Sequence, residues 1–203
     1  MDWHEGEVRR LERRLEGDPG AVGSVVFQGS SSIRLWDTLA ADLGEPRIRN
    51  LGFGGSTLAA CARYFERLVV PCRPGALVVY VGDNDLAIGR TPAEVDASFA
   101  DLIRQVDARL GPIRFAFVSI KPSPALWAKV DAIRSANEMI RARIASRPNS
   151  DYVDVFAPML GPDGLPRPEL YAGDGLHLSR AGYRLWAEVI LSDRPSLGFG
   201  PPR

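Results

Sequence analysis

The sequence contains few of the residues that stabilise small secreted domains or bind metals, since its 203 residues include only two cysteines and two histidines. No stretch approaches the roughly 18 apolar residues of a membrane-spanning helix. Residues 1–17 are too charged for a secretory signal peptide. We therefore expect a cytoplasmic protein in which Cys61 and Cys72 are free thiols.

The sequence also lacks an excess of charge of either sign. Lys and Arg total 25, Asp and Glu total 25, and the formal net charge is zero. Proteins that bind nucleic acids or anionic membranes usually present a basic surface. We therefore expect neither a nucleic acid nor a membrane as a partner.

The length of the chain suits one domain with a self-sufficient core, because a chain of this size buries roughly 70% of its unfolded surface. We expect a single domain over residues 1–193, with a helix in residues 1–17 packing on it. Residues 194–203 are rich in Pro and Gly and are expected to form a tail. The charged N-terminal helix and this tail leave a homo-oligomer possible.

Short apolar segments that alternate with amphipathic ones predict the fold class. The expected strands are residues 24–28, 47–50, 76–81, 113–120 and 151–156. The expected helices are residues 1–17, 33–43, 57–70, 91–110, 124–146 and 179–191. This alternation indicates an α/β fold with a central parallel sheet of about five strands and helices on both faces. Ligands bind such sheets at the carboxyl ends of the strands.

One of the two histidines stands in a position suited to acid–base chemistry. His177 follows Asp174 by three residues, so that the carboxylate can orient the imidazole as a general base. Alone, this spacing equally fits a capping Asp and a surface His. His4 lies in the charged N-terminal segment, where a solvated side chain is expected.

Three consecutive serines follow the first strand. Ser30, Ser31 and Ser32 open a helix, where a hydroxyl lies among backbone N–H groups that have no intrahelical acceptor. Such a hydroxyl is a candidate nucleophile, although serine is also a favoured N-cap. The chain has no Gly-x-Ser-x-Gly elbow of the α/β-hydrolases.

Two further loops offer hydrogen-bond donors at the same edge of the sheet. Gly54 and Gly55 follow the second strand and allow a close backbone approach to a ligand, because they lack Cβ. They do not complete a dinucleotide-binding sequence, since Ser56 and Thr57 stand where a third glycine belongs. Asn84 follows the third strand and carries an amide donor, though Asn also suits turns.

At these residues the sequence resembles the SGNH hydrolase superfamily, the GDSL-like esterases and lipases. The matching blocks are Gly29-Ser30-Ser31, the segment from Asn50 to Thr57, Gly82-Asp83-Asn84-Asp85, and Asp174-Gly175-Leu176-His177. The one departure is Ser30, which replaces the aspartate of the usual Gly-Asp-Ser block. The resemblance implies a flavodoxin-like, three-layer α/β/α sandwich.

The resemblance also implies a serine esterase that needs no cofactor and no metal. Ser31 would be the nucleophile, His177 its general base and Asp174 the acid that orients the imidazole. The N–H groups of Ser31 and Gly55 and the side chain of Asn84 would form the oxyanion hole. The expected substrate is a small-molecule ester, with a short acyl group preferred. Four side chains of these loops are candidates to line its pocket: Phe53, Leu86, Trp127 and Tyr171.

Two other functions remain open at the level of sequence. Asp83, Asp85, Asp174 and His177 could serve as ligands of a metal-dependent phosphoesterase. Alternatively, Ser30 in place of the family's aspartate could mark a non-catalytic binding module with a decayed site.

Overall fold

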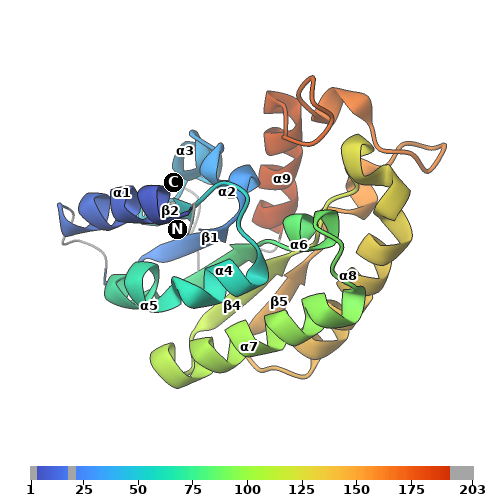
Figure 1. Cartoon of the computed structure of the whole chain (residues 1–203). Coiled ribbons are helices and arrows are strands. Elements are labelled where there is room, and N and C mark those ends of the chain that lie inside the picture. The colour runs from blue at the N-terminus through green and yellow to red at the C-terminus, as the bar shows by residue number, and fades with distance from the viewer. Residues whose placement is uncertain (1–3, 18–21, 193–203) are drawn as a thin grey trace.

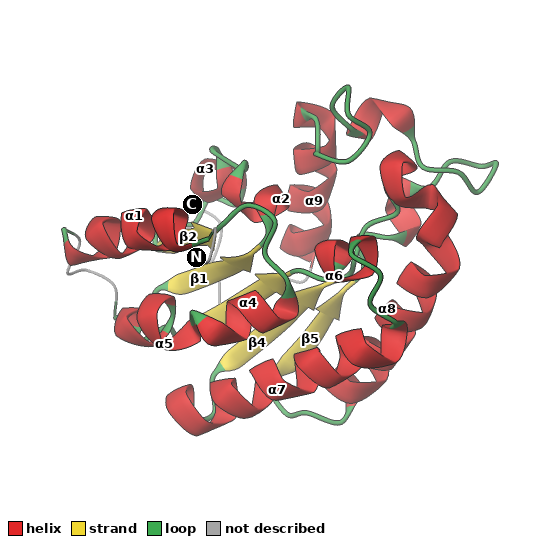
Figure 2. Cartoon of the chain, in the orientation of Figure 1, coloured by secondary structure: helices red, strands yellow, loops and turns green. Residues whose placement is uncertain are grey.

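A single sheet of five parallel strands forms the centre of the computed structural model, which describes residues 4–17 and 22–192. The strands are β1 (Val25–Gly29), β2 (Ile48–Gly52), β3 (Ala76–Tyr80), β4 (Arg114–Val118) and β5 (Ser150–Val153). Their order across the sheet is β2-β1-β3-β4-β5. The strand arrows point in one direction, toward the side that carries the longest loops (Figures 1 and 2). The predicted parallel sheet is confirmed.

Helices cover both faces of the sheet, so the chain forms a three-layer α/β/α sandwich (Figure 1). The helices are α1 (Glu5–Glu16), α2 (Ser31–Arg34), α3 (Leu39–Asp42), α4 (Leu58–Arg63), α5 (Phe65–Leu68), α6 (Asp83–Ala87), α7 (Pro92–Leu110), α8 (Val130–Ala145) and α9 (Arg180–Ser192). Short 3-10 helices lie at η1 (Val70–Cys72), η2 (Pro124–Lys129), η3 (Ala157–Met159) and η4 (Pro168–Leu170). None of these described helices has both the length and the apolarity of a membrane span.

Alternating side chains of the strands supply two separate cores. On β3, Leu77 and Val79 pack with α1, α4, α5, α7 and α8, whereas Val78 and Tyr80 pack with α2, α3 and α9. All five residues of β3 are buried, as expected for a strand covered on both faces. Cys61 and Cys72 are free and buried in the first of these cores, as predicted.

Several predicted boundaries change in the structure. The expected helix at residues 33–43 is two short helices, α2 and α3. Just before α3, Thr38 Oγ1 donates to Asp42 Oδ2 at 2.7 Å. Side chains of this kind bond locally and compete with a continuous helix. The expected helix at 57–70 is divided in the same way into α4 and α5, and α6 replaces an expected loop. The tail at 194–203 lies outside the described residues.

The N-terminal helix packs on the body, but its histidine is not at the surface as expected. His4 is 8% exposed, and its ring meets the edges of Phe53 and Tyr64 at centroid distances of 5.3 and 6.4 Å. The charged segment therefore has an apolar inner side that also includes Val8 and Leu11.

Glycine at position 52 allows α2, which carries the candidate nucleophile Ser31, to lie directly on β2. A Cβ added to Gly52 would lie 2.3 Å from the backbone nitrogen of Arg34 and 2.8 Å from the carbonyl carbon of Ile33. Both atoms belong to the backbone of α2, so they cannot move aside as a flexible side chain would. Gly52 therefore sets the distance between β2 and α2.

We predict that Gly52→Ala lowers the free energy of unfolding by about 2–3 kcal/mol, because the added methyl group overlaps main-chain atoms. Urea denaturation measures this change. Gly6→Ala is the matched control, since a Cβ at Gly6 meets nothing within 4 Å and alanine favours a helix. Equal stability of Gly52→Ala and wild type would contradict the close approach of α2.

Candidate active site

The helix that carries the candidate nucleophile begins directly after β1. Ser30 is its N-cap residue and Ser31 its first residue. The Ser30 N–H donates to the Tyr80 carbonyl at 3.0 Å, which fixes this turn against the end of β3. Ser30 and Ser32 are 0% and 1% exposed, whereas Ser31 is half-buried. Of the three serines, Ser31 alone presents appreciable surface to solvent.

Ser31, His177 and Asp174 form a continuous chain of hydrogen bonds. His177 Nε2 lies 3.0 Å from Ser31 Oγ, and His177 Nδ1 lies 2.5 Å from Asp174 Oδ2. The structure thus brings together residues that are 146 positions apart in the sequence. A histidine bridging a hydroxyl and a carboxylate is the arrangement that activates a serine nucleophile.

The second oxygen of Asp174 holds the turn that presents the histidine. Asp174 Oδ1 accepts hydrogen bonds from the backbone N–H groups of Leu176 and His177, both at 2.9 Å. The hydrogen bond from His177, together with these two backbone bonds, holds the pKa of the Asp174 carboxyl well below its usual range. Asp174 is therefore ionised at neutral pH and can stabilise a protonated imidazole.

The candidate oxyanion donors lie on the loops that follow β2 and β3. Gly55 has φ = 63°, a left-handed conformation that glycine adopts without strain. Asn84 lies in the first turn of α6, and its Nδ2 donates to the Ser56 carbonyl at 3.0 Å. This bond joins the two loops and uses one of the two amide hydrogens of Asn84.

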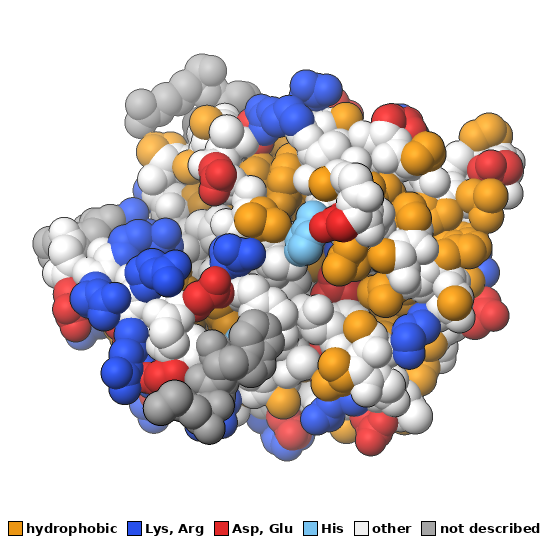
Figure 3. Space-filling model, turned by 45° about the horizontal axis from the view of Figure 1, so that its top comes forward, with side chains coloured by type: hydrophobic (Ala, Val, Ile, Leu, Met, Phe, Trp, Pro, Cys, Tyr) orange, Lys and Arg blue, Asp and Glu red, His pale blue; other side chains and the backbone are white. Residues whose placement is uncertain are grey.

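The strand order explains why these loops meet. The chain leaves β1 for the edge strand β2 and later returns to β3 on the other side of β1. A reversal of this kind creates a crevice at the carboxyl ends of the two strands. Figure 3 shows a histidine exposed beside an acidic side chain and bordered by hydrophobic side chains.

Comparison with known proteins assigns the arrangement to a family. The sequence profile of the GDSL-like Lipase/Acylhydrolase family matches residues 17–185. The chain belongs to this family. Family members are ester-hydrolysing serine hydrolases, and the chain is accordingly a serine hydrolase that acts on ester bonds.

Individual proteins resemble the chain in sequence or in structure at low sequence identity. The platelet-activating factor acetylhydrolase IB subunit alpha1 of Bos taurus is 29% identical over 172 residues, covering 78% of this chain and 69% of the relative. A GDSL-like lipase from Bacteroides thetaiotaomicron has a TM-score of 0.72 and 21% identity, over 90% of this chain and 96% of that chain. A mutant acetyl-xylooligosaccharide esterase from Geobacillus has a TM-score of 0.70 and 18% identity, over 90% and 99%.

A buried ion pair lies next to Asn84, the candidate side-chain donor to an oxyanion. Lys121, which follows β4, donates to Asp83 Oδ2 and to the Tyr80 hydroxyl, both at 2.9 Å, and its side chain is 1% exposed. Burial opposes ionisation of Asp83, but the charge and hydrogen bonds of Lys121 and the Tyr80 hydroxyl outweigh it and lower the Asp83 pKa. Asp83 Oδ1 in turn accepts from the Asn84 N–H at 3.0 Å.

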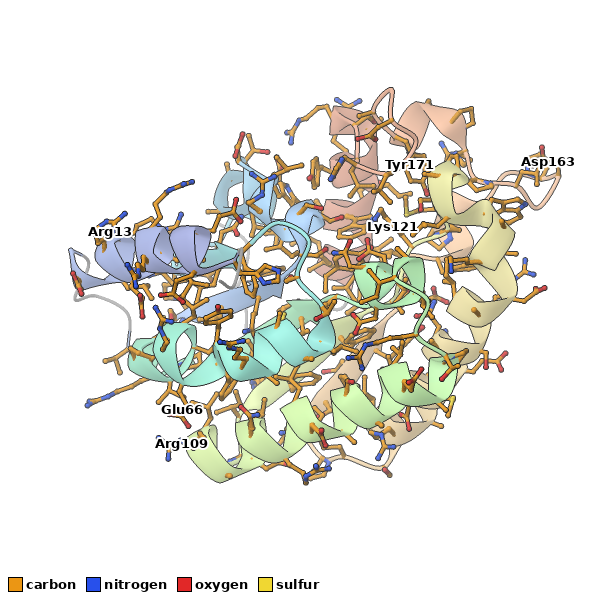
Figure 4. All side chains as sticks on the ribbon, viewed as in Figure 1. Arg13, Glu66, Arg109, Lys121, Asp163 and Tyr171 are labelled. Carbon is orange, nitrogen blue, oxygen red and sulfur yellow. The ribbon has the colours of Figure 1, made fainter. Side chains whose placement is uncertain are left out.

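Sequence reasoning missed this role of Lys121, and one signal could have found it. The residue stands in an apolar stretch directly after a strand, where a lysine is buried only with a partner. Figure 4 shows Lys121 beside the strand ends and Tyr171 in the loop nearby. The Tyr171 hydroxyl donates to the Pro122 carbonyl, and the Ala125 N–H donates to the Gly175 carbonyl at 3.1 Å. Residues 121–125 thus contact both the segment that holds Asn84 and the loop that holds Asp174 and His177.

The candidate metal ligands have other partners. Asp83 is paired with Lys121, Asp85 accepts from the Leu58 N–H at 3.0 Å, and Asp174 is bound to His177. Within the described part of the chain, His, Cys, Asp and Glu form no group of three or more that could hold a metal ion.

Most of the side chains predicted to line an acyl pocket pack into the body of the protein. Phe53 and Leu86 are 0% and 1% exposed, which leaves no surface for a substrate. Tyr171 is also buried and is held by Pro122. In this structure the apolar side chains of these three residues serve packing. Trp127, on η2, is half-buried and keeps part of its surface open.

We predict that Asp85 makes the stability of the fold depend on pH. Burial, opposed by the Leu58 N–H, raises the pKa of Asp85 to about 6. A raised carboxyl pKa stabilises the folded state fully below the ordinary value of about 4, and this contribution is lost as the pH rises through 6. As the pH rises from 4 to 7, the free energy of unfolding of Asp85→Asn should therefore increase by about 2–3 kcal/mol relative to that of wild type. Urea denaturation at both pH values measures the difference; the same difference at both would contradict the raised pKa.

Proposed function

We propose that the chain hydrolyses small carboxylic esters, acetyl esters in particular, through an acyl-enzyme formed on Ser31. The observation that carries the proposal is the hydrogen-bonded chain from Ser31 through His177 to Asp174. These three hydrogen-bonded residues face the crevice at the carboxyl ends of the strands. The loops after β2 and β3, which hold backbone and amide donors, lie beside them.

The geometry supports a two-step acyl transfer. His177 Nε2 accepts the proton of Ser31 Oγ while that oxygen attacks the ester carbonyl carbon. The resulting imidazolium is stabilised by ionised Asp174 and then gives its proton to the departing alcohol. In the second step His177 activates a water molecule, whose oxygen attacks the acyl carbon and releases the carboxylic acid from Ser31.

The developing negative charge needs donors that are oriented before the reaction starts. Three groups are suited to this role: the N–H groups of Ser31 and Gly55 and the second amide hydrogen of Asn84. Ser31 opens α2, where the first N–H groups lack intrahelical acceptors. Asn84 is held by its bond to the Ser56 carbonyl and by the Asp83–Lys121 pair.

Two observations favour a small acyl group. Phe53, Leu86 and Tyr171 pack inward, so they do not widen the site into a long apolar groove. In addition, the names of two relatives, the acetylhydrolase subunit and the acetyl-xylooligosaccharide esterase, refer to acetyl groups. The alcohol part of the substrate is not specified by these features.

We predict that Ser31→Ala lowers kcat for p-nitrophenyl acetate by about 10⁴–10⁶-fold and abolishes labelling by a fluorophosphonate, with the fold retained. Ser32→Ala, at the buried neighbouring serine, is the matched control and should keep both. Labelling of Ser31→Ala would reassign the nucleophile. Wild-type protein that resists the probe would favour a metal-dependent phosphoesterase or a binding module.

For Asn84→Ala, we expect kcat to fall on the order of 10²–10³-fold with little change in KM, since an oxyanion donor acts mainly in the transition state. Steady-state kinetics with p-nitrophenyl acetate separates the two parameters. A rise in KM at unchanged kcat would instead assign Asn84 to binding of the ground state.

A further inference from the structure

The glycine-rich loop after β2 is held by a side chain from outside the region that matches the family. The match starts at residue 17, whereas α1 spans Glu5–Glu16. From this helix, Glu7 Oε2 accepts a hydrogen bond from the Gly54 N–H at 2.6 Å. The Gly54 N–H belongs to the peptide group immediately before the one that carries the candidate oxyanion donor, the Gly55 N–H.

Glu7 also faces the helix that bears Ser31. Its Oε1 lies 3.7 Å from Nη1 of Arg34, which is three residues beyond Ser31 on α2. A Cβ at Gly54 would lie 3.2 Å from Arg34 Nε and 3.5 Å from Glu7 Oε2. Gly54 is thus enclosed by an acidic and a basic side chain, and Glu7 joins the glycine loop to the nucleophile helix.

The helix that carries Glu7 is anchored independently of this loop. Glu5 and Glu12 both accept hydrogen bonds from Arg67, at 2.7–3.0 Å, and Val8 is fully buried. Figure 1 shows α1 near α5, the helix that contains Arg67. Glu7 therefore projects from a fixed element, which makes it suited to hold a loop in one position.

We infer that Glu7 is a positioning residue that fixes the Gly54 peptide and thereby orients the Gly55 N–H toward the reacting carbonyl. The inference rests on the proposed oxyanion role of Gly55. A hydrogen bond to a carboxylate is stronger than one to a neutral acceptor, and glycine pairs are otherwise free to change conformation. Arg34 offsets the negative charge that Glu7 brings near the oxyanion.

This role predicts an effect on turnover and not on substrate binding. A misplaced donor weakens stabilisation of the transition state while the ground-state complex is little affected. Glu7→Ala should therefore lower kcat for p-nitrophenyl acetate by on the order of 10–100-fold at nearly constant KM. It should also weaken inhibition by a trifluoromethyl ketone, whose adduct carries an oxyanion.

Two further variants separate positioning from a general contribution to folding. Glu7→Gln keeps an oxygen that can accept from the Gly54 N–H, so it should restore most of the turnover that Glu7→Ala loses. Glu12→Ala is the matched control, because it removes a carboxylate that anchors the same helix through Arg67 without touching the loop. It should lower Tm and leave kcat unchanged.

The inference fails if Glu7→Ala keeps wild-type kcat, if Glu7→Gln is as impaired as Glu7→Ala, or if Glu12→Ala loses turnover equally. Ser31→Ala, measured in parallel, keeps this test apart from that of the proposed function. An active Ser31→Ala would overturn the proposed nucleophile, whereas an inactive Ser31→Ala with a fully active Glu7→Ala overturns only the role of Glu7. If Glu7→Ala does not fold, Glu7→Asp, one methylene shorter, should show the same loss of kcat.

Discussion

The close approach of β1 to β3 is the constraint on which the site depends. A Cβ at Gly29 would lie 2.0 Å from the Tyr80 carbonyl oxygen, so only glycine allows the two strand ends to lie at this distance. The Ser30 N–H then bonds that same oxygen, and Ser31 begins α2 one residue later. Since Asn84 follows β3 by four residues, one backbone contact sets both the candidate nucleophile and a candidate oxyanion donor in place.

The sequence was sufficient to predict the alternation of strands and helices along the chain and the loops at the carboxyl ends of the strands, because both follow from local patterns. Alternating apolar segments identify strands buried on both faces, and the rule that ligands bind at carboxyl strand ends selects the loops. The helix expected at 91–110 likewise begins where Thr91 and Glu94 form a capping box, with Pro92 in its first turn. The proximity of Ser31 and His177 required the family resemblance in addition, since no local pattern joins positions this far apart.

The features that were not predicted depend on long-range packing. Phe53 is an aromatic residue in a loop at the strand ends, as a substrate contact would be, but its ring packs against His4 from the N-terminal segment and Tyr64 from the end of α4. The sequence around His4 is charged, so nothing local indicates that its ring is buried. Burying the charged side chain of Lys121 costs free energy of desolvation. Only the folded chain supplies the partners that offset this cost, Asp83 and Tyr80.

The two loops that carry the candidate oxyanion donors are held by different kinds of contact. Asn84 is supported from the protein interior by the buried Asp83–Lys121 pair, which cannot exchange its partners for water. The glycine loop is supported from outside by Glu7, a partly exposed side chain on a helix beyond the family match. A buried pair resists change because breaking it leaves an uncompensated charge. The contact made by Glu7 is only partly buried, so its loss leaves no buried charge without a partner, and the proposed role of Glu7 can be tested by substitution without breaking the core.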